Sequence, residues 1–319
     1  MKLGIFTALF SDLSLEEVIR RIQPLGIQAV ELATGNYGAP AHIKLEWLDE
    51  PGKLEDLRKR LEDAGLVISA LGCGGNVLHP DGRIGGQHAE TNRRTILLAE
   101  KLGVPNVIDF SGCPGDSDDA KYPNFVTVAW PPDYPEVLQW QWEKKVIPFW
   151  KERAQFARDH GVRIAIEMHP GFVAYSPETL LRLRAEAGPN LGCNFDPSHM
   201  FWQGIDPCLA VRKLGEAVFH VHAKDTRIYD SNARVNGILD TKPYGDEANR
   251  SWIFRTVGYG HGPEFWTDFI STLSMIGYDG VISIEHEDSL MSVEDGLEKA
   301  AAFLSQILIR KKLAAMWWA

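Results

Sequence analysis

The sequence predicts an α/β fold in which eight β/α units close into a barrel of parallel strands. Strand and helix signals alternate along all 319 residues. Short apolar runs, typical of parallel strands that are buried on both faces, are separated by amphipathic patterns of helical length. No linker divides the chain, so we expect one domain over residues 1–319. A doubly wound sheet of similar length is the structural alternative.

The apolar runs give the strands of this barrel in order. Each run has the length of a strand and is bounded by turn residues or by a helical pattern. A chain of this length is typical of a single (β/α)8 barrel, the TIM-barrel architecture. The predicted strands cover Lys2–Thr7, Ala29–Thr34, Val67–Cys73, Asn106–Gly112, Arg163–His169, Leu191–Asp196, Val218–Asp225 and Gly280–His286.

Capping residues support the helices between these strands. Ser14 and Glu17 form a capping signal for the first helix, and Gly65, Gly103 and Gly161 follow the next three helical patterns. The other predicted helices cover Leu54–Ala64, His88–Leu102, Glu136–His160, Pro177–Ala187, Pro207–Glu216, Glu264–Ile276 and Val293–Leu308.

Two segments are longer than an ordinary βα loop. Residues 111–135 are rich in Gly, Pro, Asp and aromatic residues, and residues 226–263 contain several Tyr, Arg and Trp residues. Both follow predicted strand C-termini, which is the face where barrel enzymes build their sites. We expect them to cover a substrate or bind a partner; surface Ω-loops are the alternative.

Composition excludes several classes of function. A net charge of −10 leaves no basic footprint for nucleic acid or an anionic membrane, which argues against a repair endonuclease. The four cysteines show no CxxC spacing, no signal peptide is evident, and no apolar stretch has the length of a membrane span. We therefore expect a cytoplasmic protein with free thiols. The aromatic tail Met316–Trp318 leaves a non-catalytic, partner-binding barrel as another class.

Four ionisable residues end four successive predicted strands. They are Glu167, Asp196, His222 and Glu285. A buried charge costs several kcal/mol unless something pairs with it, and a shared divalent cation would pair with all four. Three carboxylates and one imidazole suit Mn²⁺, Mg²⁺ or Co²⁺, and Zn²⁺ is a further alternative. The pattern therefore predicts a metal site at the mouth of the barrel.

Neighbouring residues extend this candidate site. His169 shares a strand face with Glu167, as Glu287 does with Glu285. His199 closely follows Asp196, where it can reach substrate or metal, and Trp202 is placed either to line a pocket or to pack in the core.

The strand of His222 carries two further candidates. We interpret His220 as a hydrogen-bonded core histidine, and a partner that supports a metal ligand is the alternative. Lys224 either pairs with Asp225 or binds substrate hydroxyls.

These motifs resemble the sugar-phosphate isomerase/epimerase family of xylose-isomerase-like barrels over essentially the whole chain. The resemblance rests on Glu167, on Asp-Pro-x-His at 196–199, on His-x-His-x-Lys-Asp at 220–225 and on Glu285. It implies one divalent metal, often Mn²⁺, held by Glu167, Asp196, His222 and Glu285. It also implies that Glu167 and Glu285 serve as acid/base groups, that His199 contacts substrate, and that Arg227 lies near a substrate-binding arginine.

The sequence also departs from a minimal epimerase. His169 stands where typical epimerases have an apolar residue, and the segments 111–116, 130–134 and 258–261 are additions. These segments resemble the large subunit of bacterial C-glycoside deglycosidases, which cleave 3-keto-C-glycosides with a small β-sandwich subunit. That resemblance implies a small β subunit as partner and an oligomeric assembly.

Both resemblances imply the same chemical step. A keto sugar chelates the metal, a base removes the proton next to the carbonyl, and the cation stabilises the enediolate. A metal-bound carboxylate is a weakened base, whereas a free imidazole has a pKa near 7, which favours His169 as the base and Glu167 and Glu285 as ligands. Return of the proton gives isomerisation or epimerisation. Expulsion of an aglycone from a 3-keto-C-glycoside gives elimination, and the sequence leaves both outcomes open.

Overall fold

The computed structural model describes residues 1–311 together with 316 and 318. Its eight parallel strands close into a barrel in the order β1-β10-β7-β6-β5-β4-β3-β2, so the predicted fold class is confirmed. Every predicted barrel strand is present, and the observed bounds differ from the predicted ones by no more than a few residues. The strands are β1 Lys2–Phe6, β2 Ala29–Ala33, β3 Val67–Gly72, β4 Asn106–Phe110, β5 Arg163–Glu167, β6 Leu191–Phe195, β7 Val218–Ala223 and β10 Val281–Ile284.

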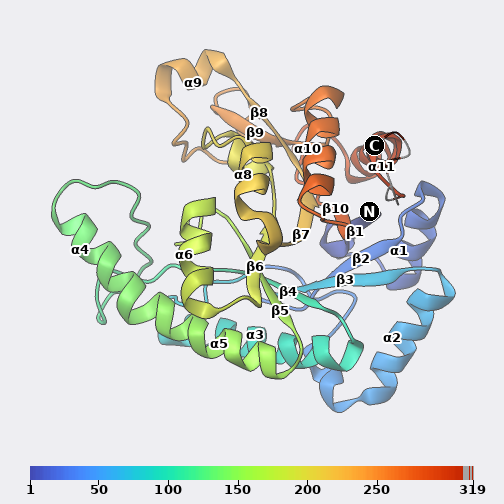
Figure 1. Cartoon of the computed structure of the whole chain (residues 1–319), viewed down its shortest axis with the longest axis horizontal. Helices are drawn as coiled ribbons and strands as arrows, with labels where there is room; N and C mark the ends of the chain where they lie inside the picture. Colours follow the sequence, from blue (N-terminus) through green and yellow to red (C-terminus); the bar gives the residue numbers. More distant parts are fainter. Residues whose placement is uncertain (312–315, 317, 319) are drawn as a thin grey trace.

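Helices surround this barrel, and the start of β1 lies beside the segment that follows α11 (Figure 1). The amino group of Met1 donates to the carbonyl of Ile309 at 2.9 Å and pairs with Asp279. Large apolar side chains of strands and helices form one continuous core. The helices that cover the barrel are α1 Leu15–Ile22, α2 Pro51–Asp63, α3 Gly82–Leu102, α5 Ile147–Asp159, α6 Pro177–Ala187, α8 Pro207–Leu214, α10 Pro263–Met275 and α11 Val293–Ile307.

Two helical regions differ most from their predicted bounds, and the other helices agree within a few residues. Helix α3 begins at Gly82 rather than His88, because Asp81 caps it by accepting a hydrogen bond from the amide of Arg83. The helix predicted over residues 136–160 is helical throughout but is divided into α4 Asp133–Trp140, a π-helical turn Gln141–Val146, and α5. Pro148, at the start of α5, lacks the N–H that a regular α-helical ladder requires, which explains the irregular turn.

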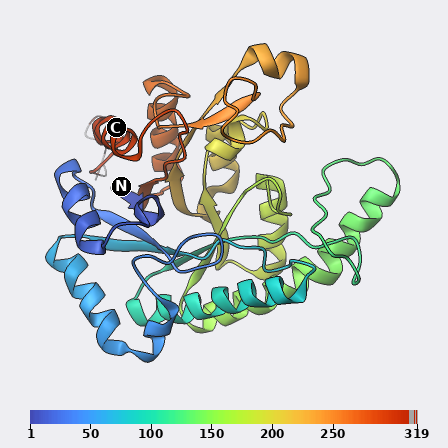
Figure 2. The ribbon, with the colours of Figure 1, turned by 180° about the vertical axis from the view of Figure 1, so that it is seen from behind.

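The long segment 111–135 reaches outward from the barrel before α4, as both views of the ribbon show (Figures 1 and 2). Its inner part is fixed by the buried side chain of Gln141, whose amide donates to the carbonyls of Pro114, Gly115 and Asn124. Its outer part exposes aromatic side chains, among them Tyr122 and Trp130.

The second long segment contains structure that the sequence pattern did not reveal. Strands β8 Asp225–Ile228 and β9 Trp252–Arg255 pair antiparallel, with helix α9 Asp230–Asn236 between them (Figure 1). Asp225 anchors this ribbon, since its Oδ2 accepts hydrogen bonds from the amides of Gly258, Gly260 and His261. A Cβ at Gly260 would lie 2.3 Å from the carbonyl oxygen of Thr226, so only glycine fits there. The unusual sequence of segment 258–261 is therefore explained by its hydrogen bonds to Asp225 and by the close approach of Gly260 to Thr226.

The four cysteines are free, as expected. Among the described residues, no helix combines the length and the apolar character that a membrane crossing would need. In the aromatic tail, Met316 and Trp318 are exposed, and Trp317 lies outside the described residues.

Candidate metal centre at the barrel mouth

The four predicted ligands converge at the C-terminal end of the barrel. Glu167 is the last residue of β5, Asp196 and Glu285 directly follow β6 and β10, and His222 lies near the end of β7. One donor atom from each residue lies within 4.8 Å of the donors of the other three. Because adjacent parallel strands end at one rim, residues distant in sequence meet around one point.

Unpartnered polar atoms mark the centre of this cluster. The Oδ2 atom of Asp196 and the Nδ1 atom of His222 are buried, and neither has a hydrogen bond of good geometry. His222 Nδ1 lies 3.0 Å from Glu285 Oε2 and 3.4 Å from Glu167 Oε2. A buried polar atom without a hydrogen bond is costly; Lys224 Nζ, 3.1 Å from Asp196 Oδ2, offsets part of this cost by its charge, and a shared cation would satisfy both atoms. The donor set of three carboxylates and one imidazole fits a divalent metal.

The charges of the cluster depend on one another. Burial raises the pKa of Glu167 to about 7, so this carboxyl is the easiest of the set to protonate without a cation. Burial also opposes ionisation of Glu285, but Lys224 and His222 outweigh it and hold the pKa of Glu285 well below its usual range. For His222, burial favours the neutral ring, yet Glu31 and Glu285 outweigh burial and raise the pKa of the imidazole.

Lys224 is buried between three carboxylates rather than paired with Asp225. Its Nζ atom lies 2.8 Å from Glu285, 3.0 Å from Glu287 and 3.1 Å from Asp196. Burial alone would lower the pKa of this ammonium group, but the three carboxylates raise it well above its usual value. Lys224 thus supplies a fixed positive charge beside the cluster.

Two further histidines, His169 and His199, lie beside the cluster on the side of β5 and β6. His199 Nε2 lies 3.3 Å from Glu167 and 3.4 Å from Asp196, and burial lowers its pKa to about 4. The ring centroids of His169 and His199 are 4.1 Å apart.

His169 is neutral in this setting. Its Nδ1 lies 2.6 Å from the carbonyl oxygen of Pro170, so Nδ1–H donates and Nε2 keeps the lone pair. Burial, with a smaller effect of His199, lowers the pKa of His169 to about 3. The pKa of this ring therefore lies below the value near 7 that is expected of a free imidazole, because the ring is packed against its neighbours and not free in solvent.

A hollow of about 430 Å³ opens beside the cluster and reaches Glu167, His222 and Glu285. Its walls come mainly from segments after β1, β2, β4 and β10. Neither long segment contributes to this lining, although Phe254 of β9 packs against His199 and Lys224 from the other side. The hollow is lined in part by Phe6, Tyr37, Phe110, His286 and Glu287.

Two predicted substrate-binding residues lie away from this hollow. Trp202 stacks on Trp252 with ring centroids 4.6 Å apart, so it packs against the β8–β9 ribbon. Arg227 is exposed on β8 and donates to the carbonyl of Gly260 at 3.4 Å. The structure brings neither residue into the carboxylate cluster.

The sequence pattern missed three buried residues around the cluster. Glu31 of β2 lies 2.9 Å from His222 Nε2. Asn194 donates to Glu167 Oε2 at 3.0 Å and is itself 2.9 Å from His220 Nδ1, which confirms His220 as a hydrogen-bonded core histidine. Asp109 of β4 also lines the hollow. Each is a polar residue within an apolar strand, which was the available signal.

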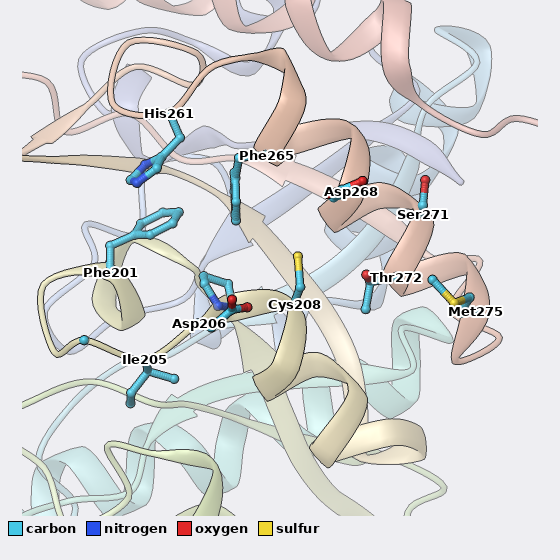
Figure 3. Close-up of a pocket in the computed structure, with 12 residues that line it drawn as sticks. Phe201, Ile205, Asp206, Cys208, His261, Phe265, Asp268, Ser271, Thr272 and Met275 are labelled. Carbon is cyan, nitrogen blue, oxygen red and sulfur yellow. The ribbon is translucent and has the colours of Figure 1, made fainter.

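A second hollow, of about 650 Å³, lies outside the barrel between α8 and α10 (Figure 3). His261 and Phe201 face each other at its edge, with ring centroids 3.7 Å apart, and Cys208 lies farther in. None of the four converging ligands lines this hollow, which separates it from the candidate metal centre.

Fold and site together define a class of protein: a closed (β/α)8 barrel with a buried carboxylate–imidazole cluster at the C-terminal mouth. Within that class, the chain belongs to the xylose isomerase-like TIM barrel family, which it matches over residues 19–307.

Individual relatives agree with this placement. The chain is 40% identical over 312 residues to the uncharacterized protein YfiH of Bacillus subtilis (strain 168), covering 97% of this chain and 99% of that protein. A D-tagatose 3-epimerase-like protein is similar in structure, with a TM-score of 0.63, 22% identity and coverage of 96% of this chain and 98% of that one. An IolI protein with a bound zinc atom has a TM-score of 0.63 at 17% identity, with 97% and 98% covered.

Proposed function

We propose that this protein is a divalent-metal-dependent enzyme that removes a proton next to the carbonyl of a keto sugar and thereby isomerises or epimerises it. The observation that carries the proposal is the convergence of Glu167, Asp196, His222 and Glu285, in which two buried donor atoms make no hydrogen bond, beside a hollow of about 430 Å³. The D-tagatose 3-epimerase-like neighbour supports a keto sugar as the substrate class.

Those four residues would hold the ion, with Mn²⁺ as our first choice and Mg²⁺, Co²⁺ or Zn²⁺ as alternatives. Zinc is the metal in the IolI structure. When bound, the ion supplies a Lewis acid for the negative charge that develops on the sugar oxygens. Asn194 orients Glu167 for this task by donating to its Oε2.

The proton transfer is the work of the surrounding side chains. In our proposal His169 accepts the proton at Nε2, since Nδ1–H is held by Pro170 and the neutral ring has its lone pair free. A pKa of about 3 makes His169 a weak base in the closed site, so Glu167 and Glu285 are the other acid/base candidates. Both carboxylates face the hollow, where a sugar would lie.

Binding of the sugar hydroxyls falls to buried polar groups that contact the carboxylates of the cluster. His199 has both ring nitrogens free of hydrogen bonds, and Lys224 holds an ammonium beside the cluster. Trp202 and Arg227 would contact only a part of the substrate that extends past the β8–β9 ribbon.

An aromatic wall favours the lyase outcome as the second candidate. Phe6, Tyr37 and Phe110 line the hollow and would accept the aromatic aglycone of a 3-keto-C-glycoside. Loss of the C2 proton would then form a double bond between C1 and C2, break the bond from C1 to the aglycone, and leave the aglycone carbon to take up a proton. The lyase reaction would also involve a small β subunit and an oligomeric assembly. The exposed side chains of Tyr122 and Trp130 offer an apolar contact surface for such a partner.

Incubation in D₂O with Mn²⁺ distinguishes these outcomes. Ketohexoses and 3-keto-C-glycosides are supplied in turn, and products are followed by NMR and mass spectrometry. Deuterium in a rearranged sugar supports isomerisation or epimerisation, and release of an aglycone supports elimination. Absence of both products and of solvent exchange next to the carbonyl, with metal bound, would reject the proposal. Native mass spectrometry of the 35.7 kDa chain tests for a partner subunit or self-association.

A further inference from the structure

Glu31 is a buried carboxylate with no role in the ligand set, and its position is unusual. It lies in the middle of β2, on the opposite side of the barrel from β5 and β6, and is 1% exposed. Its Oε2 atom lies 2.9 Å from His222 Nε2 and accepts a hydrogen bond from Ser283 at 3.2 Å. A buried carboxylate requires such partners, and here the nearest one is the imidazole of a candidate metal ligand.

The hydrogen bond fixes which nitrogen of His222 carries a proton. A carboxylate oxygen can only accept, so Nε2 must carry the hydrogen. The ring then presents Nδ1 toward Glu167 and Glu285, at 3.4 and 3.0 Å. Nδ1 is also one of the buried atoms without a hydrogen-bond partner. Phe6 stacks on the ring, with centroids 5.9 Å apart, and limits its rotation.

A second ion between Glu31, His220 and His222 is the competing explanation, because these three residues also cluster. His220 is already occupied: its nitrogens lie 2.9 Å from Asn194 Oδ1 and 3.3 Å from Ser69 Oγ. The 2.9 Å between Glu31 and His222 is the length of a charge-assisted hydrogen bond. The contacts therefore favour a hydrogen-bonded carboxylate over a second metal site.

We propose that Glu31 is a positioning residue of the metal centre, holding Nε2–H of His222 so that Nδ1 binds the ion. The inference rests on the proposed metal-dependent function and deepens it. Partners that hold a metal-bound histidine through its distal N–H typically change metal affinity 10- to 100-fold when removed. Glu31 acts from a strand that carries no ligand of the four-residue cluster.

Mn²⁺ affinity measured by titration calorimetry tests the proposal on three variants and the wild type. Glu31→Leu removes the acceptor and should weaken binding roughly 10- to 100-fold. Glu31→Gln keeps an acceptor oxygen without the charge and should bind with intermediate affinity. Ser283→Ala is the matched control, because it removes the other hydrogen bond to the same oxygen and should stay within about threefold of the wild type. Circular dichroism checks that each variant folds.

A second readout follows the ring itself. In Zn²⁺-loaded protein labelled with ¹⁵N-histidine, the wild type should show His222 ligated through Nδ1 with a retained Nε2–H. Glu31→Gln should keep that signature with a weaker hydrogen bond, which decides the matter even where Glu31→Leu fails to fold. A Glu31→Leu variant with wild-type affinity, ligation through Nε2, or two ions per chain would overturn the inference alone. A wild type that binds no divalent metal would overturn the proposed function as well.

Discussion

Asp109 and Asp196 lie at the same end of the barrel, and both are almost completely buried. Asp109, on β4, is fully provided with partners: the amides of Gly75 and Phe110 and the side chain of Asn92 donate to it at 2.7–3.0 Å. Asp196, after β6, receives one amide hydrogen bond on Oδ1, whereas its Oδ2 accepts no hydrogen bond and is held only by the charge of Lys224, whose Nζ lies 3.1 Å away.

This difference separates a structural carboxylate from one that is prepared for a ligand. When every oxygen of a buried carboxylate accepts hydrogen bonds from the protein, none of them is free to bind a cation. Strands β5, β6, β7 and β10 instead bring donor atoms of four side chains to a common point, and two of these atoms, Asp196 Oδ2 and His222 Nδ1, make no hydrogen bond. Strands β1 to β4 supply the walls of the hollow and the positioning carboxylate Glu31 instead.

Substitution of the two aspartates should have opposite consequences for metal binding, and this is the largest effect we expect. Asp196→Ala removes a ligand and should lower Mn²⁺ affinity by more than about 100-fold, with turnover lost in parallel, since even a supporting residue typically accounts for 10- to 100-fold. Asp109→Asn should leave Mn²⁺ affinity at the wild-type value. Calorimetric titration measures both. Equal affinities in the two variants would remove the distinction between the two acids.

Replacement of His169 tests whether proton transfer also takes place on the side of the barrel formed by β5, β6, β7 and β10, which carries the four candidate ligands. His169→Gln should lower kcat by roughly 10²- to 10⁴-fold, the usual range for a general base, while metal content stays at the wild-type value. His160→Gln, at the end of α5 and far from the cluster, is the control and should keep full activity. Activity retained in His169→Gln would pass the role of base to Glu167 or Glu285.

The pH dependence of stability tests the structural acid. Burial raises the pKa of Asp109 from its usual 3.8 to about 7, so the folded state holds this proton more tightly than the unfolded chain does. The stabilising contribution is complete below about pH 4 and is lost as the pH rises through 7, a change on the order of 3–4 kcal/mol. Asp109→Asn should therefore flatten the curve between pH 4 and 8. Denaturant unfolding of both proteins measures it, and parallel curves would show that Asp109 does not titrate on folding.

The barrel could be predicted because its signals are local. Apolar strands and capped helices repeat along the chain, and a carboxylate or imidazole at the end of a strand can be read without knowing its neighbours. The convergence of Glu167, Asp196, His222 and Glu285 followed from strand order alone, because all parallel strands end at one rim.

The features that the sequence did not predict depend on contacts between segments that are distant along the chain. Glu31 stands in the middle of β2 rather than at its end, and only the closed barrel brings it to His222. Strand β9 pairs with β8 across a segment without strand periodicity, so the position of Phe254 over His199 could not be inferred. The low pKa of His169 likewise comes from its packing, which the sequence does not give.

The smallest effect we expect concerns the wall of the hollow. Tyr37 is 62% exposed and stands against Phe110, with ring centroids 6.5 Å apart, so it can contact a substrate without touching the ligands. Tyr37→Ala should raise KM by roughly 5- to 10-fold, equivalent to about 1–1.5 kcal/mol of an aromatic contact, and leave kcat and Mn²⁺ affinity nearly unchanged. Tyr134→Ala, on the outward segment, is the control and should change neither. Steady-state kinetics with the active substrate decides between them: a fall in kcat for Tyr37→Ala would place this side chain in the chemical step and so extend the reactive region onto the β1–β4 side of the barrel.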